Sequence, residues 1–100
     1  MPMDAQAMLV HAAEAADFLK ALANDQRLAI LCCLLEGPKS VGQINERVQL
    51  SQSALSQHLA VLRERTLVET QKQSQTIIYS VPEGRTRRIL HLLHECFCGI

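Results

Sequence analysis

The stretch SQSALSQHL, residues 51–59, decides the fold of this chain. Ser51 can cap a helix over residues 52–65, because a serine side chain accepts a hydrogen bond from the first turn of a helix. Leucines then recur every three or four residues along one face, at Leu55, Leu59 and Leu62. This spacing predicts an amphipathic helix with one buried face and one polar face.

A second, shorter helix is expected directly before this one. Ser40 and Gln43 have the spacing of a capping box, which predicts a helix from Ser40 to about Val48. The three residues QLS that follow predict a tight turn. Two short helices joined by such a turn are typical of a helix-turn-helix.

Two further helices are expected upstream. Asp4–Leu22 is rich in alanine and contains neither Gly nor Pro, which favours a helix. Asn24 or Asp25 can cap a second helix over residues 26–36, and a Gly-Pro pair follows it directly as a stop signal.

Downstream, the pattern changes from helical to extended. LVETQK and TIIYSV are rich in β-branched residues and predict a hairpin over Leu67–Lys72 and Thr76–Val81. The tip lacks Asn-Gly, so we expect a longer or looser turn. Pro82 then opens a last helix to about Cys98. The order is that of a winged helix-turn-helix, mainly α with a β-hairpin wing, in a single domain over residues 1–100.

Composition limits the function classes. The chain has 100 residues, with 10 Lys and Arg against 10 Asp and Glu, so a DNA-binding role must rest on local features. The N-terminus lacks a signal peptide, and the longest apolar run, Leu28–Leu35, is too short to span a membrane. A cytoplasmic protein without a membrane partner is expected. No Gly-rich phosphate loop and no nucleophile–base pattern is present, so neither an enzyme nor a cofactor is predicted.

The polar face of the helix over residues 52–65 is the predicted DNA reader. A recognition helix contacts bases with its N-terminal residues, glutamine can bond bidentately to adenine, and serine suits bases or phosphates. His58 lies close to the leucine stripe and is left open between a packed, hydrogen-bonded histidine and a phosphate contact. The phosphate-side cations, which are the positively charged side chains predicted to contact DNA phosphates, are Arg63, Arg65 and Lys72. The predicted DNA-binding set is Ser51, Gln52, Ser53, Ser56, Gln57, His58, Arg63, Lys72 and Gln73.

Four cysteines occur as ILCCLL, residues 30–35, and HECFCG, residues 94–99. Because structural disulfides are rare in a reducing compartment, they indicate packing thiols, metal ligands or a redox device. By periodicity, Cys32 lies on the apolar stripe, whereas Cys33 lies nearer the polar boundary, where a thiol is more reactive. This leaves the choice between Cys32 and Cys33 open.

The last helix carries the other two cysteines. Cys96 lies on its apolar stripe and is expected to pack, whereas Cys98 lies in the last turn beside His91 and His94. An alternative metal site consists of His91, Glu95 and Cys98, which share one helix face and are legitimate zinc ligands.

The segments LKALANDQRLAILCCLLEGPKSVGQI, LSQSALSQHLAVLRERTLVET and TIIYSV resemble the ArsR/SmtB winged-helix repressors of bacteria. SQSALSQHL is especially similar to the branch that contains HlyU, BigR and SqrR. The resemblance implies a homodimer joined through the helices over residues 4–22 and 83–98, which binds double-stranded operator DNA and leaves it when an inducer acts. Two departures are Thr66, where relatives usually have Gly, and the wing sequence QKQSQ, where they usually have several Arg and a Gly.

The same branch senses oxidants or reactive sulfur through two cysteines. Matched residue by residue, the resemblance implies that Cys32 and Cys98 are the redox-sensing pair, with Cys33 and Cys96 as packing or modulating thiols. A disulfide or a longer sulfur bridge between the pair then releases DNA. Two alternatives remain: a metal- or metalloid-responsive repressor that uses the cysteines and His91, and a winged helix used only for protein association.

Overall fold

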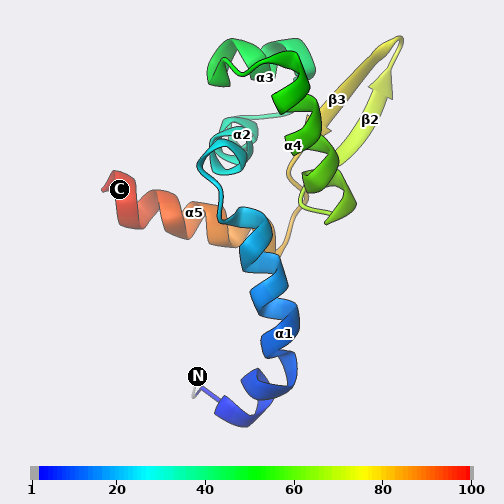
Figure 1. The fold of residues 1–100 in the computed structure, drawn as a ribbon. Coiled ribbons are helices and arrows are strands. Elements are labelled where there is room, and N and C mark those ends of the chain that lie inside the picture. Colours follow the sequence, from blue (N-terminus) through cyan, green and yellow to red (C-terminus); the bar gives the residue numbers. More distant parts are fainter. Residues whose placement is uncertain (1–2, 100) are drawn as a thin grey trace.

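The computed structural model describes residues 3–99, and its element order confirms a mainly helical fold with a β-hairpin wing (Figure 1). The elements are α1 Ala5–Leu22, α2 Asp25–Leu35, β1 Lys39–Ser40, α3 Val41–Val48, α4 Gln52–Glu64, β2 Glu69–Gln73, β3 Thr76–Ser80 and α5 Arg85–Cys98. In Figure 1, α1 extends away from the other elements, and α4 lies beside the wing.

Side-chain caps start the helices where the sequence predicts them. The Asp4 carboxylate caps α1, and Asn24 caps α2 by accepting from the backbone of Gln26 and Arg27. Ser40 and Gln43 form the predicted capping box of α3. These caps satisfy backbone N–H groups that have no partner inside the helix.

The corner between α1 and α2 is clamped by Arg27. Its Nε donates to the Ala21 carbonyl at 2.6 Å, and its terminal nitrogen donates to the Lys20 carbonyl at 3.2 Å. A cation at the C-terminus of α1 is also favoured by the helix dipole. The direction of α1 relative to α2 is therefore held by a residue of α2.

The turn between α3 and α4 is as tight as predicted. Gln49 takes the left-handed conformation with φ 53°. The Asn45 side-chain oxygen accepts from the Leu50 N–H at 2.9 Å, and Ser51 Oγ accepts from the Ala54 N–H at 3.2 Å. Backbone groups at the turn thus have partners, which fixes the angle at which α4 leaves α3.

The sheet differs from expectation in two ways. The short strand β1 was not predicted, and it pairs antiparallel with β3 to give the order β1–β3–β2. The prediction of a longer or looser hairpin turn was wrong, because Gln73 pairs with Thr76 and leaves a two-residue turn. Ser74 takes a positive φ of 56° there, a role that Asn or Gly usually fills at lower steric cost.

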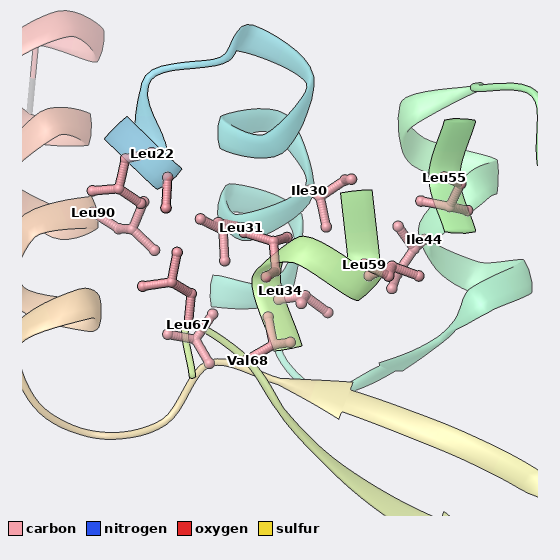
Figure 2. Packing of buried hydrophobic residues seen from close by; sticks show 13 residues of the cluster. Leu22, Ile30, Leu31, Leu34, Ile44, Leu55, Leu59, Leu67, Val68 and Leu90 are labelled. Carbon is pink, nitrogen blue, oxygen red and sulfur yellow. The ribbon is translucent and has the colours of Figure 1, made fainter. Parts of the chain in front are cut away.

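The core is built almost entirely from aliphatic side chains (Figure 2). Ile30, Leu31 and Leu34 of α2 lie in the middle, with Leu90 of α5 on one side and Ile44 of α3 on the other. All five are at most 1% exposed. The helix that carries Cys32 and Cys33 is therefore the central element of the molecule.

The two outer helices leave apolar side chains uncovered. On α1, Leu9 and Leu19 are 69% and 53% exposed; on α5, Leu92 and Phe97 are 57% and 83% exposed. The last helix begins at Arg85, not near Pro82, because Gly84 precedes it with φ 121° and offers no side-chain cap. Within residues 3–99, no helix combines the length and apolar character needed to cross a membrane.

Candidate nucleic-acid interface and thiol groove

The reader face of α4 is exposed, as predicted. Leu55, Leu59 and Leu62 are buried against the core, which turns the polar face of the helix outward. The predicted base- and phosphate-contacting residues Ser51, Gln52, Ser53, Ser56 and Gln57 are all exposed. A polar face at a helix N-terminus, presented by a helix-turn-helix, suits the major groove of DNA.

His58 is bonded to a neighbouring helix instead of projecting freely into solvent. Its Nε2 lies 2.8 Å from the side-chain oxygen of Gln26 on α2, and the residue is half-buried. Of the two readings left open, the structure thus favours the hydrogen-bonded histidine, which ties α4 to α2. No sequence pattern marks Gln26 as its partner, because the contact joins residues 32 positions apart.

The phosphate-side cations differ in their availability. Arg63 of α4 and Lys72 of β2 are exposed and, among residues 3–99, form no ion pair; the neighbouring Gln73 is also exposed. Arg65 instead pairs with Asp17 of α1 at 2.5 Å. The expectation that Arg65 serves phosphate is therefore corrected: its charge is used to hold the end of α4 to α1.

A groove of about 610 Å³ lies between α2, α3 and α5. Ala29, Leu35 and Val48 supply apolar surface. Its polar lining consists of Cys32, Cys33, Glu36, Arg47, His91 and His94. Glu36 is shared by Arg47, which forms a short ion pair with it, and by Lys39 at 3.5 Å. One carboxylate between two cations leaves this end of the groove with a net positive charge.

The four thiols are distributed differently from the periodic pattern. Cys32 is half-buried and Cys33 is only 7% exposed, so the prediction that Cys33 lies nearer solvent was wrong. The cause is that α3 packs on the polar side of α2 and covers it. Cys96 was expected to pack, but both Cys96 and Cys98 are exposed. The apolar stripe of α5 packs on the core through Ile89, whereas Leu92 and Cys96 of the same stripe are exposed.

Burial raises the pKa of the Cys32 thiol, and a negative charge on Cys98 raises it further. Burial also raises the pKa of Cys33, while Lys39 opposes the rise. Both thiols line the same groove.

The alternative metal site is not assembled. Among residues 3–99, no three His, Cys, Asp or Glu side chains are grouped so that they could hold a metal ion. His91, Glu95 and Cys98 share a helix face, but within the described residues they are not brought together as such a group.

The end of α4 contains a strained residue. Thr66 has φ 60°, a left-handed conformation that a β-branched side chain rarely adopts. It lines a cavity of about 260 Å³ beside the pair formed by Asp17 and Arg65.

Comparison with known proteins agrees with this geometry. The family model described as "Bacterial regulatory protein, arsR family" matches residues 24–70, which span α2 to the start of β2. "Transcriptional activator HlyU" of Vibrio cholerae is 47% identical over 97 residues, covering 97% of this chain and 90% of that protein.

Solved structures give the same result. Reduced HlyU from Vibrio cholerae superposes with a TM-score of 0.86 at 47% identity, covering 93% of this chain and 98% of that chain. The transcriptional repressor BigR from Xylella fastidiosa superposes with a TM-score of 0.89 at 36% identity, covering 96% of this chain and 98% of that chain. The chain therefore belongs to the arsR family of bacterial regulatory proteins and is a DNA-binding transcriptional regulator, not an enzyme.

Proposed function

We propose that the protein is a homodimeric repressor that binds operator DNA when its thiols are reduced and leaves it when Cys32 and Cys98 become linked. The inducer is an oxidant or a reactive sulfur species. The observation that carries the switch is geometric: α5, which ends in Cys98, packs against α2, and Cys32 lines the groove between these helices. The charge of Cys98 also adds to the rise in the pKa of Cys32. Of the two adjacent cysteines, only Cys32 is influenced by Cys98, which supports it as the partner.

The exposed reader face supports operator binding, and the uncovered apolar side chains support a dimer. Leu9, Leu19, Leu92 and Phe97 are large and exposed and lie on α1 and α5. Exposed apolar side chains gathered on neighbouring elements mark surfaces that another chain covers. A dimer also supplies two reader helices, which compensates for the few free cations of each chain.

The two thiols have different roles in the proposed reaction. Cys98 is exposed, so its thiolate attacks the outer sulfur of a low-molecular-mass persulfide RSSH. Cys98 becomes a persulfide, and the thiolate RS⁻ leaves. The Cys32 thiol then gives its proton to solvent and attacks the Cys98 sulfur, the disulfide forms, and hydrosulfide leaves. The persulfide is the oxidant, so electrons and sulfur atoms balance.

Closing the bridge draws the end of α5 toward α2. Because α2 holds α4 through the hydrogen bond between Gln26 and His58, a shift of α2 reaches the reader helix. Core elements that are closely packed transmit such shifts instead of absorbing them. The proposal therefore includes a physical connection from the thiols to DNA.

The test is release of operator DNA when an organic persulfide is added. Fluorescence anisotropy of labelled DNA measures the release, and the intact mass of the protein shows whether the two thiols have become linked. Wild-type protein is expected to lose affinity by at least tenfold and to gain a Cys32–Cys98 linkage. Cys98→Ser and Cys32→Ser are expected to remain bound. Cys96→Ser, which changes an equally exposed thiol of the same helix, is the matched control and is expected to release DNA.

Persulfide-driven release from the Cys98→Ser protein contradicts the switch. Titration with zinc or arsenite tests for a metal-responsive repressor. DNA release with added metal mass and with Cys32 and Cys98 unlinked contradicts the switch. If selection from a random DNA pool yields no preferred sequence, the protein is a winged helix used for protein association.

A further inference from the structure

A second groove, of about 490 Å³, separates the reader helix α4 from the wing. Aliphatic side chains of α4 and α3 form part of its wall. Its polar lining consists of Ser56, Arg63, Glu64 and Tyr79. Ser56 and Arg63 are already in the predicted DNA-binding set, whereas Tyr79 of β3 is new.

Three hydrogen-bond donors in this groove lack partners. Among residues 3–99, the side chains of Ser56, Arg63 and Tyr79 form no hydrogen bond or ion pair with another residue. The Tyr79 ring packs against the core, but within the described residues its hydroxyl is not among the buried groups that lack a partner, so it reaches the solvent side of the groove. The open side of the groove is where an external acceptor can supply one.

The surrounding charges define what that acceptor can be. Arg63 brings a full positive charge, and Glu64 of the same groove opposes it. Lys39 pairs with Tyr79 across the sheet, but its ammonium is held by Glu36 at 3.5 Å and by the Gly37 carbonyl at 3.5 Å. Net charge alone is therefore too small to hold a free anion, and the site suits an anion brought to it by a larger ligand.

Helical side chains lean toward the N-terminus of their helix, so Arg63 reaches back toward the half of α4 that reads bases. Ser56 lies on that half, beside Gln57. A DNA strand whose bases are read by the N-terminal residues of α4 carries its phosphates past the flank of the same helix. The groove lies on the flank that faces the wing.

We propose that Tyr79, together with Ser56 and Arg63, binds a backbone phosphate of the operator strand that passes between α4 and β3. The Tyr79 hydroxyl donates to a phosphate oxygen, and the arginine supplies the charge. The assignment rests on the proposed operator binding and adds the wing's inner strand to the DNA-contacting surface. It gives β3 a role that does not depend on the poorly basic wing tip.

The first experiment measures operator affinity against NaCl concentration for Tyr79→Phe and Arg63→Gln. Tyr79→Phe is expected to weaken binding of the dimer about tenfold, from one lost hydrogen bond in each protomer. Its salt dependence is expected to stay that of wild type, because no charge is removed. Arg63→Gln is expected to reduce the slope of log K against log salt by about two for the dimer. Ser80→Ala removes a hydroxyl from the opposite face of the same strand and is expected to change neither quantity.

The second experiment separates a DNA contact from a structural role. Each phosphate of the half-site is replaced in turn by a neutral methylphosphonate. At one phosphate, replacement is expected to weaken wild-type binding but to add little loss to Tyr79→Phe, because both changes remove the same interaction.

Wild-type affinity of Tyr79→Phe, or additive losses at every phosphate, overturns the assignment while leaving operator binding intact. Failure of wild-type protein to bind any selected operator instead overturns the proposed function, and this assignment with it. The two failures are therefore distinguishable in the same assay.

Discussion

The reader face and the thiol groove are built in opposite ways. The reader face comes from one helix, whose cap, buried stripe and exposed residues lie within Ser51–Glu64. The groove gathers side chains from α2, α3 and α5, which are separated by much of the chain. A surface made from one element can be predicted from its periodicity, whereas a site made from three depends on how those elements pack.

The largest expected effect is a difference in stability between substitutions on the buried face and on the exposed face of α4. Leu62→Ala is expected to lower the free energy of unfolding by about 3 kcal/mol, because Leu62 is fully buried and its truncation leaves a cavity. Gln57→Ala is expected to change stability by less than about 0.5 kcal/mol and to cost about 1–3 kcal/mol of discrimination at one base pair. Urea unfolding and binding to single-base operator variants measure the two quantities. Equal stability loss in both variants contradicts the assigned faces.

A smaller effect concerns the link between the two regions. Replacement of His58 and Gln26 by alanine, singly and together, is expected to give a coupling free energy of about 1 kcal/mol in unfolding, since one hydrogen bond joins them. The double-mutant cycle also applies to DNA release: loss of this bond is expected to weaken the response to persulfide. Fully additive losses contradict a direct interaction.

The substitution Thr66→Gly tests whether the backbone just after α4 is strained. Relief of the left-handed strain at a β-branched residue is expected to outweigh the added freedom of the unfolded chain, for a net gain of about 0.5 kcal/mol. Thermal and urea unfolding give the sign. Thr66→Ala keeps a side chain at the same φ and is expected to gain less; a loss of stability on going to glycine contradicts the strain.

The smallest effect is electrostatic and lies in the groove. Cys98→Ser is expected to lower the pKa of Cys32 without restoring its ordinary value, because burial is the larger cause of the rise. A raised pKa keeps Cys32 protonated at neutral pH, so its alkylation by iodoacetamide rises with pH, and the serine variant shifts that rise to lower pH. The rates are measured with Cys33 and Cys96 replaced by alanine. An unchanged profile contradicts the proximity of Cys32 and Cys98.

The sequence predicts features that lie within one helix or turn better than features that depend on how several elements pack. Local chemistry was enough to predict several features of the fold. These are the caps at Asn24, Ser40 and Ser51, the tight turn before α4 and the exposed reader residues. Strand β1 was missed because two residues carry no pattern of their own. The tight turn at Ser74 was missed because its residue pays a conformational cost that the pairing of β2 with β3 offsets.

The cysteines show the limit of periodicity most clearly. The pattern of α2 describes only the face turned toward the main core, so it assigned Cys33 to the boundary. Helix α3, placed by the turn at Gly37 and by the pairs of Glu36, covers that boundary. Likewise, the apolar stripe of α5 is real, but a single chain leaves part of it uncovered, and Cys96 with it.

The clamp that Arg27 forms on the last carbonyls of α1 bears on the operator itself. If α1 joins two chains, its fixed direction relative to α2 and α4 sets the separation of the two reader helices. That separation must match the repeat of about 34 Å between successive major grooves on one side of the duplex. In the proposed dimer, the Arg27 guanidinium at the α1–α2 corner therefore helps to set the number of base pairs between half-sites.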